Sequence, residues 1–171
     1  MTQMTTVLRV IGRLLYRGFM LCLWLLLLLY VVYKLVERSQ TIAALPAQLE
    51  VEGVLLVGSG CGVAVLRMSP ALRVRLQREG LATLQAARQA RGHPGSDYYR
   101  YGPWQATPIG QLEADSSSPI MPGLQCTDID AELTSRIIRA SQEEGGYYSD
   151  NDGGTLLLLP REGMIVYGYF G

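Results

Sequence analysis

The sequence contains one histidine, one lysine and two phenylalanines among 171 residues. With His93 as its lone imidazole, the chain is poorly supplied for a metal site built on histidines and for a Ser-His-acid triad. We therefore predict no metal and no cofactor, and we interpret His93 as a solvated loop residue. All basic residues other than Lys34 are arginines, a bias that fits a GC-rich bacterial genome.

Clusters of positive charge are also missing from most of the chain. Residues 1–39 carry a net charge of +4, whereas residues 40–171 carry −4. Affinity for nucleic acid comes from clustered cations that displace counterions from phosphates, so the acidic part of the chain matches it poorly. We expect no nucleic-acid partner.

One uncharged apolar run lies near the N-terminus. Residues 18–33 read GFMLCLWLLLLLYVVY. A bilayer core of about 30 Å needs roughly 20 helical residues, with about 17 tolerated, and the charges of Arg17 and Lys34 can reach the headgroups. The run therefore predicts a transmembrane helix that contacts the lipid bilayer.

Two processed alternatives are disfavoured by what surrounds this run. A cleaved signal peptide ends in a small-residue A-x-A site, and no well-formed site occurs before Ala43. A lipoprotein signal needs small residues before its cysteine, and Cys22 follows Phe19, Met20 and Leu21. We expect the segment to be retained as an anchor.

The cations around the span predict its orientation. Three precede it, and two that are partly offset by one acid follow it: Arg9, Arg13 and Arg17, then Lys34, Glu37 and Arg38. Cytoplasmic flanks of membrane spans carry the excess of positive charge. The predicted organisation is a bacterial inner-membrane protein with a cytoplasmic segment 1–17, a transmembrane helix 18–33, a neck 34–48 and a periplasmic domain 49–171.

The domain is expected to begin with a β-hairpin. Residues 49–57 start with alternating apolar positions, and residues 61–68 resume a strand-like run after a glycine-rich turn. Ser69 and Pro70 form a helix start, and the apolar spacing that follows predicts a helix over 70–91. Gly80 inside this helix is expected to cost about 1 kcal/mol relative to alanine.

The second half of the domain reverses this order. A T-x-x-D capping box at Thr127 predicts a helix that ends at Gly145, and residues 155–159 and 164–170 predict a second hairpin. We expect an α+β domain of order ββα-loop-αββ, with one antiparallel sheet and both helices on one face. The irregular segment 92–126 is longer than ordinary loops, which makes it the first place to look for function.

Three short motifs are interpreted as structural. The GSGCG run at 58–62 lacks the spacing of a nucleophile elbow and the lysine of a phosphate loop. The SDNDGG run at 149–154 lacks the acids that a calcium loop needs at its first and twelfth positions. Glu143 and Glu144 are interpreted as solvated residues at a helix end. A carboxylate pair assembled from distant positions stays open as an enzymatic alternative.

The cysteines allow one disulfide in the domain. Cys22 belongs to the membrane segment, which leaves Cys61 and Cys126 in a compartment that we expect to be oxidising. A bridge between them would contribute about 4 kcal/mol in the chain-entropy model. The alternative is a pair of buried free thiols.

Tyrosine and tryptophan are concentrated in the long segment 92–126. Four aromatic residues and one arginine fall within seven positions: Tyr98, Tyr99, Arg100, Tyr101 and Trp104. These residue types dominate binding hot spots because they bury large areas and keep a polar group. We predict a contact patch for a periplasmic protein partner here, and the alternative is that the rings pack the loop onto the domain.

Together these features predict a non-catalytic binding protein of the bacterial envelope. One specific role is an immunity protein that neutralises a toxin acting in the periplasm. An alternative is an accessory subunit of a secretion, pilus or division complex, although the span has no small-xxx-small face for packing against other helices. An envelope hydrolase is the less favoured alternative from a different class.

Overall fold

The computed structural model describes residues 2–58, 62–109, 120–127 and 129–169. The chain divides into two compact units, residues 1–39 and 40–171. The first unit consists of α1 (Thr2–Ala43), which runs on into the second. Residues Gly12–Ala43 of α1 form a segment that is long and apolar enough to cross a membrane.

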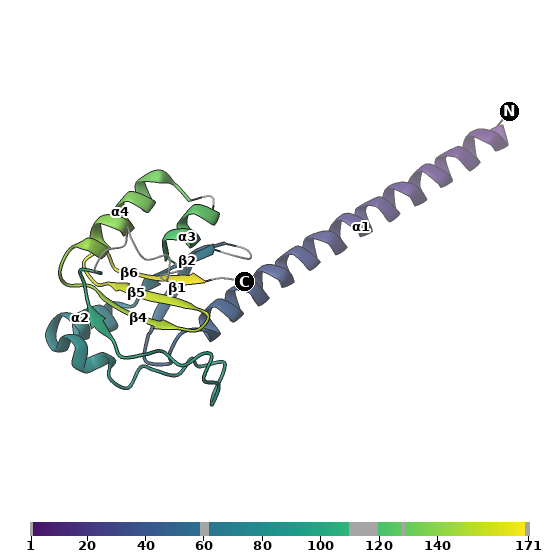
Figure 1. Ribbon diagram of the computed structural model, residues 1–171. Coiled ribbons are helices and arrows are strands. Elements are labelled where there is room, and N and C mark those ends of the chain that lie inside the picture. Colours follow the sequence, from purple (N-terminus) through teal and green to yellow (C-terminus); the bar gives the residue numbers. More distant parts are fainter. Residues whose placement is uncertain (1, 59–61, 110–119, 128, 170–171) are drawn as a thin grey trace. The chain divides into compact units, whose positions relative to one another are not determined.

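The second unit is an α+β domain built on one six-stranded antiparallel sheet (Figure 1). Its strands lie in the order β1-β2-β6-β5-β4-β3, with bounds β1 (Val51–Val57), β2 (Gly62–Met68), β3 (Gln105–Ala106), β4 (Tyr147–Asn151), β5 (Gly154–Leu159) and β6 (Met164–Tyr169). The predicted fold class and both predicted hairpins, β1–β2 and β5–β6, are confirmed. Strand β4 was not predicted.

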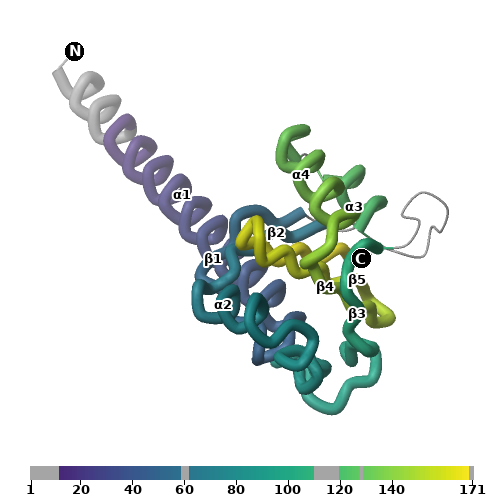
Figure 2. The backbone as a smooth tube through the Cα atoms, turned by 90° about the vertical axis from the view of Figure 1, so that its left-hand side faces the viewer, coloured from purple at the N-terminus to yellow at the C-terminus, as the bar shows by residue number. Residues whose placement is uncertain are grey.

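Helices cover both faces of the sheet rather than one, so the predicted one-sided arrangement is wrong. Figures 1 and 2 show α2 (Pro70–Glu79) on one face and α3 (Ile120–Cys126) with α4 (Ala131–Gln142) on the other. The reason lies in β5, where all six residues are buried. Leu156 and Leu158 join the core under α2, while Leu157 and Leu159 join the core under α4. A strand that is apolar on both faces needs cover on both.

The predicted first helix is also shorter than expected. Ser69 accepts a hydrogen bond from the Leu72 amide at 3.1 Å, which confirms the predicted cap. Gly80, however, adopts a φ of 58°, a value that glycine reaches without strain, and it ends α2 instead of continuing it. A 3-10 helix, η1 (Gly80–Leu84), and a series of turns follow.

The second predicted helix starts later than Thr127. Asp130 caps α4 by accepting a hydrogen bond from the Glu132 amide. Thr127 instead donates its hydroxyl to the Gly123 carbonyl of α3 and accepts from the Val63 amide. Helix α3 itself lies in the segment 92–126 that was predicted to be irregular, as does β3.

The segment predicted as a neck, 34–48, contributes to the domain core. It is helical to Ala43, and Leu45 is fully buried in the core together with Leu49, just beyond it. The Arg91 guanidinium donates to the Leu45, Pro46 and Leu49 carbonyl oxygens at 3.2, 2.8 and 2.6 Å. Desolvation by burial lowers the pKa of Arg91. Residues 40–49 are therefore bound into the domain by both apolar packing and charge-assisted hydrogen bonds.

Candidate functional site

Two members of the predicted aromatic patch lie in the core. Tyr101 is 1% exposed and donates its hydroxyl to the Ala44 carbonyl at 3.0 Å. The Trp104 indole is 9% exposed and donates to the Ala87 carbonyl at 2.8 Å. Burial raises the pKa of Tyr101 well above its usual value and that of Tyr167 to about 12, so both phenols keep their protons. These contacts attach the loop to the domain.

The other three members of the patch reach the surface. Tyr98 is 47% exposed, and its ring meets that of Tyr99 edge-on with centroids 5.0 Å apart. Tyr99 and His93 are both half-buried, and their rings stack with centroids 3.7 Å apart, so His93 is only partly exposed to solvent. Exposed Arg100 forms a 3.5 Å ion pair with Asp97. Contact with a partner at Tyr98, Tyr99 and Arg100 stays a prediction.

The sequence neighbours of the two domain cysteines are in contact. Cys126 ends α3, and Cys61 lies outside the described residues. A Cβ added at Gly62 would stand 2.8 Å from the Thr127 hydroxyl, which also accepts a hydrogen bond from Val63. Residues next to each cysteine lie side by side, Cys61 itself lies outside the described residues, and the Cys61–Cys126 disulfide stays a prediction.

We expect Cys61 and Cys126 to resist alkylation in the denatured protein until a reductant is added. Cys61→Ser and Cys126→Ser should lower thermal stability by similar amounts, since each opens the same closed loop. Cys22→Ser is the matched control, because Cys22 is a free, exposed thiol. Free labelling of both domain thiols without reductant would contradict the bridge.

A groove that sequence reasoning missed lies beside α4. It has a volume of about 450 Å³, within the range of ligand-binding pockets. Both apolar and charged side chains line it. They come from the edge strand β1, from β2, α2, α4 and β6, and from the turn before β6: Glu52, Leu55, Arg67, Arg73, Leu133, Arg136, Glu162 and Met164. Helix α3 packs on β2 and β6 and contributes no residue to the groove lining.

Two β-bulges in β1 supply one wall of the groove. At two points, neighbouring residues of β2 pair with β1 residues that are two apart, so Glu52 and Leu55 have no partner across the ladder. These two residues are also the ones that β1, described in full, exposes to solvent. Bulges turn side chains away from the regular alternation of a strand. Their effect here is to bring a carboxylate and an aliphatic group to the groove.

The charges of the groove are only partly paired. Arg136 donates to Glu162 at 2.6 Å, and this hydrogen bond raises the pKa of Arg136. Arg73 donates to the Arg161 carbonyl at 2.8 Å and forms no ion pair with a described carboxylate. The Arg67 side chain has no hydrogen-bond or ion-pair partner in the described ranges, although its backbone pairs within the sheet. Two arginines therefore keep donors available for a ligand.

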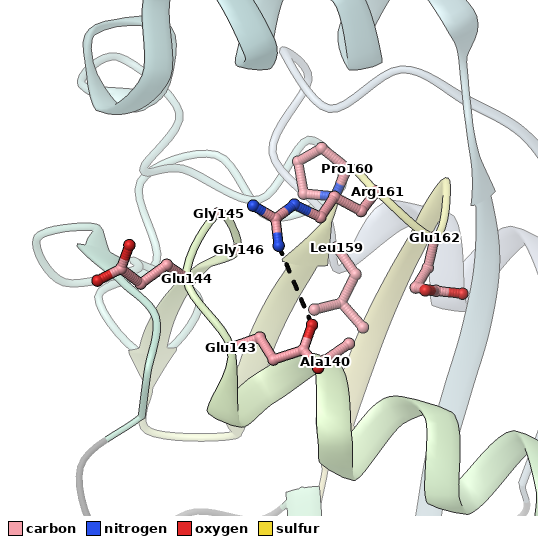
Figure 3. Close-up of a pocket in the computed structure, with 9 residues that line it drawn as sticks. All are labelled: Ala140, Glu143, Glu144, Gly145, Gly146, Leu159, Pro160, Arg161 and Glu162. Atoms are coloured by element: carbon pink, nitrogen blue, oxygen red, sulfur yellow. Dashed lines mark ion pairs between the residues drawn. The ribbon is translucent and has the colours of Figure 1, made fainter.

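A neighbouring cavity shown in Figure 3 is too small for a substrate. Its volume is about 20 Å³, which suits a single water molecule. Arg161 reaches Glu143 across it at 4.0 Å, while Glu144 and Glu162 point away. The acids around this cavity do not converge. Among the residues that the structure describes, no group of three or more His, Cys, Asp or Glu side chains is placed to hold a metal ion.

Comparisons with protein-family models, with curated proteins and with solved structures find no match to this chain. The structure itself shows an α+β domain that follows an N-terminal helix of membrane-spanning length.

Proposed function

We propose that this protein is a membrane-anchored binding protein of the bacterial envelope, whose domain lies in the periplasm and contacts a protein partner. The observation that carries the proposal is the joining of one apolar helix to a small domain that offers open surfaces. None of the apolar window in the membrane-length part of α1 is buried inside the protein. The domain exposes the groove beside α4.

Within this class, an immunity protein that neutralises a periplasm-acting toxin is the more specific proposal. The leucine-dense surface of α1 suits lipid and lacks the small-residue face that packs transmembrane helices together. That composition favours a simple tether over a subunit of a membrane complex. The decisive test looks for a toxin gene beside the gene for this protein and exposes cells with and without the protein to the product of such a gene. Survival only with the protein supports this role, and equal killing contradicts it.

The orientation gives a direct prediction. A reporter that is active only in the periplasm should give signal when fused after Gly171, and a reporter that is active only in the cytoplasm should not. The reason is the excess of arginines before the span. In a control chain with Arg13→Gln, Arg17→Gln and Glu37→Lys, this excess disappears and the periplasmic signal should fall. A cytoplasmic signal from the unaltered chain would overturn the topology.

A further inference from the structure

We propose that the groove beside α4 binds an extended segment of the partner protein that carries a carboxylate next to a large apolar side chain. This proposal rests on the proposed binding function and names its surface and the chemistry of the partner.

The apolar half of the proposal comes from the groove's aliphatic lining. Leu55 is 49% exposed at the edge of the sheet, half-buried Leu133 of α4 also lines the groove, and Met164 adds a buried thioether. A ligand side chain packed against this apolar lining would remove apolar surface from water, which stabilises the complex by about 25 cal/mol per Å². A purely polar ligand would leave this gain unused.

The carboxylate half comes from charge complementarity. Arg67 and Arg73 border the groove without an ion-pair partner among the described residues, whereas Arg136 is already neutralised by Glu162. Guanidinium groups bind carboxylates through two parallel hydrogen bonds, which fixes both position and orientation. The groove also contains the Glu52 carboxylate, so with Arg136 and Glu162 paired its lining keeps an excess of one positive charge. The domain as a whole is acidic, and this local excess favours an anion.

The bulges argue against the simplest other occupant, a second copy of this chain paired through β1. Edge strands that pair with another chain offer an unbroken row of backbone groups, and bulges interrupt that row. Two bulges occur within the seven residues of β1. The same bulges place Glu52 and Leu55 in the lining of the groove. The bulges thus serve the binding of side chains rather than the pairing of strands.

The test selects peptides from a random 12-residue display library on the detergent-solubilised full chain. We expect the enriched peptides to carry Asp or Glu within about two residues of Leu, Ile, Met or Phe. Arg67→Gln with Arg73→Gln should weaken their binding about tenfold or more, the scale of a lost charge pair. Leu55→Ser should weaken it as well.

Matched controls separate these effects from general changes in charge or hydrophobicity. Arg78→Gln removes an exposed arginine of α2, outside the groove. Val74→Ser removes an apolar side chain that is 50% exposed, close to the 49% of Leu55. Both controls should bind the peptides as the unaltered chain does, and thermal melting should show all variants to be folded.

Three outcomes would overturn the groove assignment. Enriched peptides without acids would remove the carboxylate requirement. Peptides that bind the groove variants normally but lose affinity with Tyr98→Ala would move the site to the aromatic surface and leave the binding function intact. A library that yields no binder at all would count against the groove and the proposed function together.

Discussion

Replacing Trp104 by alanine is expected to lower the free energy of unfolding by about 3 to 5 kcal/mol, as for other large buried aromatic residues. The indole is 9% exposed, and its removal also leaves the buried Ala87 carbonyl without its donor. Denaturant unfolding of the detergent-solubilised full chain, followed by near-ultraviolet circular dichroism, measures the change.

Tyr98→Ala is the control for this experiment. Tyr98 comes from the same aromatic run but is 47% exposed, and surface substitutions usually change stability by within about 0.5 kcal/mol. Equal losses for the two variants would contradict the division of the aromatic run into core and surface members. A loss confined to Trp104→Ala would leave Tyr98, Tyr99 and Arg100 as the part of the run available to a partner.

Gly154→Ala is expected to destabilise the domain by about 3 kcal/mol, at the upper end for overpacking. A Cβ at this position would lie 2.2 Å from the Gly168 carbonyl oxygen and 2.9 Å from the Tyr167 ring. The first of these atoms belongs to the backbone of β6, so relief requires the two central strands β5 and β6 to separate locally. Thermal melting should show the loss directly.

Gly53→Ala makes the same chemical change in another strand of the same sheet. A Cβ added at Gly53 meets nothing within 4 Å, so this variant should be neutral or stabilised by up to about 1 kcal/mol through a less flexible unfolded chain. Equal melting temperatures for the two variants would contradict the close approach of the β6 backbone to Gly154 of β5.

Features encoded by neighbouring residues could be predicted from the sequence. The apolar helix, the Ser69–Pro70 helix start and the two hairpins each depend on residues adjacent in the chain. Strand β4 could not be predicted this way, because Tyr147–Asn151 is rich in polar residues that are typical of turns. Its place is set by pairing with β5 and by the hydrogen bond from Ser149 to the Gly102 carbonyl.

The groove was missed for a related reason. It depends on which β2 residue faces which β1 residue, and the two register shifts that expose Glu52 and Leu55 leave no pattern in the sequence VEGVLLV. The aromatic run was found by composition, but composition does not separate Tyr98 from Trp104, since Trp104 is buried by packing against core residues that are distant in the sequence. The sequence therefore predicts which loop carries the aromatic residues, but it does not predict that Tyr98, Tyr99 and Arg100 are the members of the run that reach the surface.

The packing of residues 40–49 into the domain limits where a protease could separate the domain from the N-terminal part of α1. The side chains of Leu45 and Leu49 are fully buried in the core. The Arg91 guanidinium donates hydrogen bonds to the carbonyl oxygens of Leu45, Pro46 and Leu49. A cut that removes Leu45 or Leu49 would take away carbonyl acceptors of the Arg91 guanidinium and leave a cavity in the core. The released product would then unfold and be degraded more readily. Release of a folded domain requires a cut before Thr41, which is itself buried.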